Sequence, residues 1–405
     1  MLRINPHSDD DRFHRFGLIE WWDQHRLSAA RIVVIGAGAL GNEIVKNLAL
    51  LGIGHVLICD KDHIENSNLS RSVLFRESDN GRPKATVAAD AARAIYPGIR
   101  ARPFVGDVVN GLGAGVFKWA DVVLGGLDNR EARLFINRQC FRLGRPWIDG
   151  AMEQINGVAR VFVPDGHPAC PTDEPAPCYE CTMSQRDWQL LQHRRSCNGL
   201  TRDEMAGGRT PTTPTIGSII AGLQCQELLK LLHNLPTIAG GGMSVVGLST
   251  DVFPTRYPRK PDCTAHDQPN EIIDLAAGAA SITLRELLNI ARDKLAAEPT
   301  IDLGRDLIDH LVCPTCSRTE PVHNSLSSIA ESQLPCPHCP DTRRQVVTFS
   351  SLTATSPLLD RTPQQIGIPE FDILTARAGE RSIALCLSAD APAVLGELFD
   401  AEIEL

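Results

Sequence analysis

The segment that most constrains the fold of this 405-residue chain is residues 30–60, ARIVVIGAGALGNEIVKNLALLGIGHVLICD. It begins with an apolar run of strand length and continues through a glycine-rich loop. A stretch with apolar residues at helical spacing follows, and a second apolar run ends the segment. Two parallel strands need a long connection, usually a helix, to carry the chain back between them. The segment therefore predicts an α/β domain with a mostly parallel sheet.

The glycine loop contains Gly36, Gly38 and Gly41, and Asp60 closes the second predicted strand. Gly36 and Gly38 would let backbone amides approach phosphates at the helix N-terminus, and Asp60 would accept hydrogen bonds from ribose hydroxyls. The alternative is a glycine turn used only for close packing of the helix on the sheet. In this strand–loop–helix–strand context we favour a Rossmann-like nucleotide-binding fold.

Polar residues after Asp60 favour a nucleoside triphosphate over a dinucleotide. Asn68, Arg71 and Lys84 follow in DKDHIENSNLSR and GRPKA, and Asp62 belongs to the first of these motifs. A triphosphate that is cleaved needs its developing charge neutralised, whereas a nicotinamide needs no such cations. The alternatives are a dehydrogenase and, for each residue singly, a solvated surface charge.

A second carboxylate follows another predicted strand. Asp128 and Asn129 come directly after the apolar run ADVVLGGL and precede a helical pattern. A carboxylate at the C-terminal edge of a parallel sheet lies where ligands and magnesium bind. The same position would also suit a helix N-cap.

Eight residues in four short pairs have the spacing of zinc ligands. They predict two tetrahedral sites, one of Cys₃His and one of Cys₄ type, and the Cys₄ pairs have the spacing of a zinc ribbon. Neither site keeps a ligand position for water, so both are predicted to be structural. The pairs are Cys178-x-x-Cys181, Cys263-x-x-His266, Cys313-x-x-Cys316 and Cys336-x-x-Cys339.

One further cysteine is a candidate nucleophile. Cys197 directly follows Arg194 and Arg195 and precedes a polar, glycine-rich stretch. The arginine charges favour the thiolate, which is the reactive form. Cys170 is the second candidate, but it has acidic neighbours; the alternative is an inert loop thiol. The other cysteines are predicted to be core residues: Cys59, Cys140, Cys225 and Cys386.

The order of the motifs GAGALG, DKDHIENSNLSR, GRPKA, GLDN and CYEC resembles the adenylating domain of the ubiquitin-activating (E1-like) superfamily. That superfamily includes the ThiF, MoeB and HesA sulfur-carrier activators, and the likeness covers roughly residues 10–266. It implies an enzyme that joins AMP to the C-terminal glycine of a small β-grasp protein and releases pyrophosphate.

The resemblance also implies roles for single residues. Asp60 would bind the ribose, and Asn68, Arg71 and Lys84 would bind the phosphates. Asp128 would bind a magnesium ion and orient the attacking carboxylate. Arg15, in RFHRF, would reach the phosphates of the partner subunit in a homodimer; the alternative is a surface arginine. Cys197 would be the catalytic cysteine of a crossover loop.

The chain is long enough for two or three domains. We expect an N-terminal helical element at 1–29, an adenylation domain at 30–266 with a crossover loop at 182–214, a linker and helix at 267–300, and an α+β lobe with the zinc ribbon at 301–405. A formal net charge of -9 argues against nucleic acid as the main partner. No apolar run approaches bilayer-spanning length and the N-terminus lacks a hydrophobic signal core, so a cytoplasmic protein is expected.

These observations lead to one main hypothesis and two alternatives. The main hypothesis is an activating enzyme that uses ATP and Mg²⁺, forms a thioester on Cys197 and passes a ubiquitin-like protein to a conjugating (E2-like) enzyme. Among members of that superfamily, the chain most resembles the single-chain activators of bacterial ubiquitin-like conjugation systems, some of which serve in phage defence. The alternatives are a sulfur-carrier activator for thiamin or molybdopterin synthesis, and a binding protein with an inactive nucleotide fold.

Overall fold

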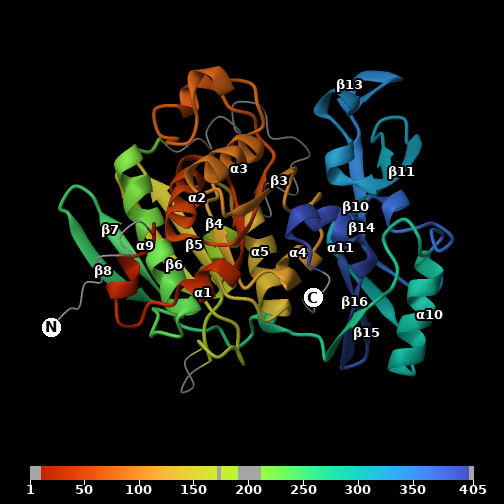
Figure 1. The fold of residues 1–405 in the computed structure, drawn as a ribbon. Helices are drawn as coiled ribbons and strands as arrows, with labels where there is room; N and C mark the ends of the chain where they lie inside the picture. The colour runs from red at the N-terminus through yellow and green to blue at the C-terminus, as the bar shows by residue number, and fades with distance from the viewer. Residues whose placement is uncertain (1–10, 171–174, 190–210, 401–405) are drawn as a thin grey trace.

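The computed structural model describes residues 11–170, 175–189 and 211–400. They form two lobes side by side, each built on one main sheet (Figure 1). Within the described ranges, every helix is too short or too polar to cross a lipid bilayer. The mixed α/β class predicted from the sequence is confirmed.

The large lobe contains an eight-stranded sheet of order β3-β2-β1-β4-β5-β6-β7-β8. The five strands from β3 to β5 are parallel, and β6 to β8 continue the sheet in antiparallel fashion. The order reverses between β1 and β4, which makes their carboxyl ends the expected ligand-binding edge. The strands are β1 (Arg31–Ile35), β2 (His55–Asp60), β3 (Arg100–Val105), β4 (Val122–Gly125), β5 (Trp147–Glu153), β6 (Asn156–Phe162), β7 (Gly241–Val246) and β8 (Asp251–Arg256).

Helices cover both faces of this sheet. Because side chains alternate along a strand, Ile32 and Val34 of β1 pack with α2, α3 and α9, whereas Val33 and Ile35 pack with α4 and α5 on the other face. The two cores cover both faces of the parallel strands. The helices are α1 (Gln24–Ala29), α2 (Ala39–Leu51), α3 (Lys84–Ile95), α4 (Gly115–Trp119), α5 (Arg130–Arg142), α6 (Tyr179–Thr182) and α9 (Pro214–Leu232).

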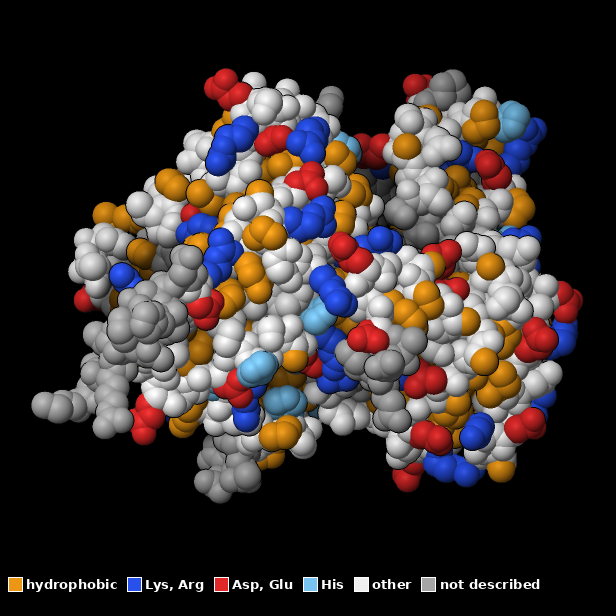
Figure 2. Space-filling view, in the orientation of Figure 1, with side chains coloured by type: hydrophobic (Ala, Val, Ile, Leu, Met, Phe, Trp, Pro, Cys, Tyr) orange, Lys and Arg blue, Asp and Glu red, His pale blue; other side chains and the backbone are white. Residues whose placement is uncertain are grey.

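The small lobe has a second sheet of order β11-β10-β15-β16-β9, with β14 also paired to β10. The β12–β13 hairpin and β11 form a zinc-ribbon-like tip, which a hollow separates from the large lobe (Figures 1 and 2). The elements are β9 (Glu271–Asp274), α10 (Leu284–Leu295), β10 (Thr300–Val312), β11 (Thr319–Ser325), β12 (Pro335–Cys336), β13 (Cys339–Arg343), β14 (Gln345–Leu352), β15 (Ile373–Ala378), β16 (Arg381–Cys386) and α11 (Ala391–Leu395).

The small lobe docks against α4 of the large one. A Cβ on Gly115 would lie 2.5 Å from the ring of the buried Phe371, and a Cβ on Gly113 would lie 2.1 Å from the carbonyl oxygen of Glu370. Both glycines therefore permit the close approach of this segment. The Arg305 guanidinium forms a buried ion pair with Asp372 at 2.8 Å and also donates to the carbonyl of Val109 at 2.7 Å. Paired charges at this depth indicate an interface shielded from water.

One segment differs from its sequence-based prediction. Residues 267–300 were expected to be a linker and one helix. The helix is present as α10, but Glu271–Asp274 forms β9, which pairs in parallel with β16. Four residues carry little local signal, and their partner strand lies far along the chain, so the pairing is decided by tertiary contacts.

Candidate active site and metal centres

A cavity of about 1120 Å³ opens at the carboxyl ends of β1, β2, β4 and β5. This is the predicted edge of the sheet, beside the reversal of strand order. Of the described residues that the sequence assigned to nucleotide and phosphate binding, two do not line it: Gly41 and Arg15. Arg15 is exposed, beside a short turn at residues 16–18. The candidates that do line the cavity are Gly36, Gly38, Asp60, Asp62, Asn68, Arg71, Lys84, Asp128 and Asn129.

The three loop glycines have different roles. Gly36 has φ +92°, and a Cβ there would lie 2.4 Å from the carbonyl oxygen of Gly126. A Cβ on Gly41 would lie 1.8 Å from the oxygen of Gly36, so these two glycines are needed for packing. A Cβ on Gly38 would meet no atom within 4 Å. Gly38 therefore leaves open the start of α2, where the first amides of a helix have no intrahelical partner.

Asn42 is a buried residue that the sequence reasoning missed. Its side-chain amide donates to the carbonyls of Ala37 at 2.8 Å and Gly38 at 3.0 Å, while its oxygen accepts from the amide of Leu74 at 2.9 Å. It therefore holds the glycine loop in shape. A polar residue at an otherwise apolar helix position was the only signal for it.

Asp60 is fixed by backbone donors at the end of β2. Its two oxygens accept from the amides of Ala37 and Asp62, each at 2.7 Å. Burial raises the pKa of the Asp60 carboxyl, against the opposing effect of these hydrogen bonds. Since a carboxylate has about four lone-pair sites, two remain for further donors such as hydroxyls.

Cationic groups line the same side of the cavity. The Lys84 ammonium lies 3.0 Å from a carboxylate oxygen of Asp62, and Arg71 donates to the carbonyl of Ser67 at 2.8 Å. Lys61, which the sequence reasoning missed, lines the cavity too and lies 3.3 Å from Asp107. Burial alone would lower the pKa of Lys61, but the nearby carboxylates of Asp107, Asp62 and Asp128 together raise this pKa.

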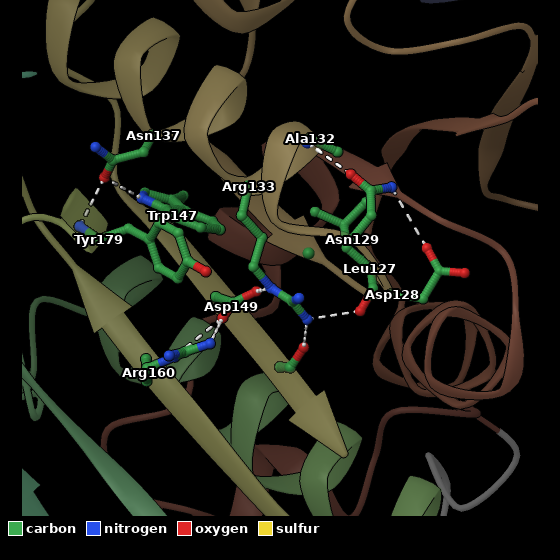
Figure 3. Close-up of polar contacts among 12 residues, drawn as sticks. Leu127, Asp128, Asn129, Ala132, Arg133, Asn137, Trp147, Asp149, Arg160 and Tyr179 are labelled. Atoms are coloured by element: carbon green, nitrogen blue, oxygen red, sulfur yellow. Dashed lines mark hydrogen bonds and ion pairs between the residues drawn. The ribbon is translucent and has the colours of Figure 1, made fainter. Parts of the chain in front are cut away.

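Asp128 stands at the start of α5 without capping it. The cap is Asn129, whose side-chain oxygen accepts from the amide of Ala132 at 2.8 Å (Figure 3). The side-chain nitrogen Nδ2 of Asn129 lies 3.4 Å from a carboxylate oxygen of Asp128. The exposed carboxylate of Asp128 is therefore available to a ligand in the cavity.

The predicted Cys₃His set comes together beside α5. The donor atoms of Cys178, Cys181, Cys263 and His266 all lie within 4.8 Å of one another. Cys178 Sγ lies 3.6 Å from Cys263 Sγ, and Cys181 Sγ lies 3.3 Å from His266 Nε2. Tetrahedral zinc with bonds of about 2.3 Å places two sulfurs about 3.8 Å apart, so the set fits zinc. We refer to these four residues as the zinc knot.

The Cys₄ set assembles in the small lobe. The sulfurs of Cys313, Cys316, Cys336 and Cys339 lie within 4.8 Å of one another, with 3.9 Å between those of Cys316 and Cys336. Both clusters could hold zinc, and His266 takes the place expected of it.

The remaining cysteines divide as follows. Cys197 lies outside the described residues. Cys170 is partly exposed, and burial raises the pKa of its thiol, which disfavours the thiolate. The four cysteines predicted to be core residues are all buried: Cys59, Cys140, Cys225 and Cys386.

Comparisons with known proteins define the class of this chain. The sequence pattern of the ThiF family matches residues 11–265. The chain therefore belongs to the ThiF family, which confirms the E1-like resemblance of its motifs.

Individual relatives carry several names. The SAMP-activating enzyme E1 of Haloferax volcanii is 31% identical over 59% of this chain and 81% of its own length. The sulfur carrier protein adenylyltransferase of Thermus thermophilus is 28% identical over 66% of this chain and 95% of its own. A crystal structure of E. coli MccB with ATP aligns with 65% of this chain and 75% of that one, at 21% identity and a TM-score of 0.52, and so supports the fold.

Proposed function

We propose that the protein is an ATP-dependent adenylyltransferase that activates the C-terminal carboxylate of a small carrier protein. The main support is a single cavity that combines an open helix N-terminus at Gly38, the cations Arg71 and Lys84, and the available carboxylate of Asp128. The names of the relatives, which include adenylyltransferases and activating enzymes, agree with this reaction.

The reaction follows from these groups. A carboxylate oxygen of the carrier attacks the α-phosphorus of ATP, the bond from that phosphorus to the bridging oxygen breaks, and pyrophosphate leaves. Asp60 binds the ribose, Asn68, Arg71 and Lys84 neutralise the phosphates, and Arg15 of a second subunit adds a further positive charge. Magnesium held at Asp128 would supply additional charge neutralisation. In well-oriented intramolecular reactions, positioning alone removes roughly 7–11 kcal/mol of the barrier, so holding both substrates in line contributes beside the charges.

ATP–pyrophosphate exchange with a β-grasp protein ending in glycine tests this proposal. Lys84→Ala should reduce the exchange rate strongly, because the leaving phosphates lose a cation. Lys46→Ala is the matched control, since Lys46 pairs with Glu43 on α2 and does not line the cavity. Exchange at background with the wild-type chain, or equal rates in the two variants, would contradict adenylation.

We further propose that Cys197 receives the acyl group as a thioester and passes it to a conjugating enzyme. Cys197→Ala should abolish an enzyme–carrier adduct that added thiols cleave while leaving exchange intact, and Cys170→Ala should keep both. A carrier product about sixteen daltons heavier would instead identify a sulfur-carrier activator, the reaction that the Thermus relative's name favours.

A role in phage defence stays a prediction. Counting phage plaques on cells that carry the wild-type protein or the Lys84→Ala variant checks it.

The proposed homodimer has support from the surface of the large lobe. Leu248, Val252 and Phe253 expose large apolar side chains on the β7–β8 hairpin at the edge of the sheet. Phe253→Asp should shift the protein toward monomer in light scattering coupled to gel filtration. A wild-type mass equal to one chain would contradict the dimer and, with it, the role of Arg15.

A further inference from the structure

A carboxylate is buried between two arginines directly beneath the cavity. Asp149, on β5, is fully buried, and one of its oxygens accepts from Nε of Arg133 at 2.8 Å. Its other oxygen accepts from Arg160 on β6, through Nε at 3.0 Å and through a second guanidinium nitrogen. Removing charges from water is costly, so the positions of all three side chains are tightly constrained by one another (Figure 3).

Arg133 also contacts the backbone beside the ligand-binding carboxylate. One of its terminal nitrogens donates to the carbonyl of Leu127 at 2.6 Å and to that of Gly150 at 3.0 Å. Leu127 directly precedes Asp128, and Gly150 lies on β5 where the strand lines the cavity. Arg133 thus ties the Asp128 loop to the neighbouring strand, while Asn129 contacts Asp128 from the other side (Figure 3).

The far end of the same network meets the zinc knot. The guanidinium of Arg160 lies 5.2 Å from the ring centre of Tyr179, which directly follows Cys178 and begins α6. The amide of Tyr179 donates to the side-chain oxygen of Asn137 at 2.8 Å. The zinc knot and the Asp128 loop are therefore joined through packed polar contacts from β6 and α5.

We propose that Arg133 is a positioning residue for Asp128, and that Asp149, Arg160 and Tyr179 hold it in place from the zinc knot. The inference rests on the proposed adenylation for the role of Asp128. The planar guanidinium pairs with Asp149 through one nitrogen and with two carbonyls through another, which the single ammonium of a lysine cannot reproduce. Arg133 itself lines the cavity, but the proposed role is exerted through the backbone beside Asp128, whose carboxylate binds the metal of MgATP.

The test uses Arg133→Lys, with Mn²⁺–ATP as the probe and its binding followed by electron paramagnetic resonance. The variant keeps the charge opposite Asp149 but loses the carbonyl contacts. Its Kd for Mn²⁺–ATP should rise about tenfold. Arg142→Lys is the matched control, because Arg142 is a partly buried arginine of α5 that also donates to a carbonyl, that of Ile373 at 3.1 Å, on the side of the small lobe. It should lower Tm without changing the Kd.

A double-mutant cycle separates positioning from general destabilisation. In an Asp128→Asn background, Arg133→Lys should have no further effect on the Kd, because the group it positions is gone. An unchanged Kd for Arg133→Lys alone, or an additive effect in the double variant, would overturn the inference. A wild-type chain that binds no Mn²⁺–ATP would instead contradict the proposed function.

Two variants of Tyr179 test the connection to the zinc knot while Arg133 stays unchanged. Tyr179→Phe keeps a ring beneath Arg160, whereas Tyr179→Leu removes it. With bound zinc verified as equal by mass spectrometry, Tyr179→Leu should weaken Mn²⁺–ATP binding several-fold and Tyr179→Phe should not. Equal binding by the two variants would refute the contribution of Tyr179.

Discussion

Replacing Gly38 with alanine should abolish tight nucleotide binding without destabilising the protein. A Cβ at this position would meet no protein atom within 4 Å and would project into the cavity. Gly38 also has a negative φ of -74°, which alanine adopts readily. The methyl group would therefore occupy only the space above the start of α2, where a phosphate is expected.

The size of the effect follows from the amides that the methyl group would shield. Asn42 is the first residue of α2 whose amide bonds back along the chain, to Gly38 at 2.9 Å. The earlier helix residues that line the cavity, Ala39 and Leu40, therefore have amides without an intrahelical partner. A hydrogen bond to a charged group contributes about 1.5–3 kcal/mol. Losing one should raise the Kd for ATP by about 10- to 150-fold.

Gly36→Ala is the contrasting variant, measured beside Gly38→Ala by calorimetric titration with ATP and by thermal melting without it. The positive φ of Gly36 costs about 1–3 kcal/mol for a residue with a side chain, and the contact with Gly126 adds to this. Gly36→Ala should therefore lower Tm, and Gly38→Ala should not. ATP binding by Gly38→Ala within twofold of wild type would refute the assignment of this helix terminus to phosphate.

Three further predictions concern the metal, the core and pH. His266→Cys should retain the zinc content of the wild type and His266→Ala should lose one ion per chain, as measured by elemental mass spectrometry. Leu287→Ala, at a fully buried position of α10, should lower the free energy of unfolding by about 2–5 kcal/mol in urea, whereas Leu50→Ala at a half-exposed position should have little effect. Burial, together with the charge of Arg100, lowers the pKa of His55 in the folded protein below the ordinary histidine value of 6.5. Because the unfolded chain then binds the proton more tightly, the free energy of unfolding decreases as the pH falls through 6.5. His55→Gln should reduce this loss of Tm, and an equal reduction in the exposed His25→Gln would contradict the explanation.

The sequence was most informative where the signal is local. The β1–α2–β2 unit follows from apolar periodicity over residues 30–60, and the structure has it as predicted. Paired cysteines were equally informative, because ligand spacing within a pair is a property of the chain itself. The donors of both predicted ligand sets come together in two clusters that could hold zinc. Motif order likewise pointed to nine residues that line the cavity.

Other features depended on which segments meet in three dimensions. Residues 271–274 form a strand only because β16 lies beside them. The network of Arg133, Asp149 and Arg160 could not be predicted, since a charged residue in a helix or strand is usually a surface residue until its partner is known.

The glycine loop combines both kinds of information. The spacing of its three glycines was enough to predict a sharp turn before a helix, because that conformational requirement belongs to the local backbone. The separate roles of the glycines depend on the tertiary structure. The backbone of Gly126 packs against Gly36, and the backbone of Gly36 packs against Gly41, whereas Gly38 faces the cavity. The sequence by itself determined the elements and the chemistry available to them. The tertiary structure decided which groups are buried, paired or open to a ligand, because those properties depend on neighbours that are distant in the chain.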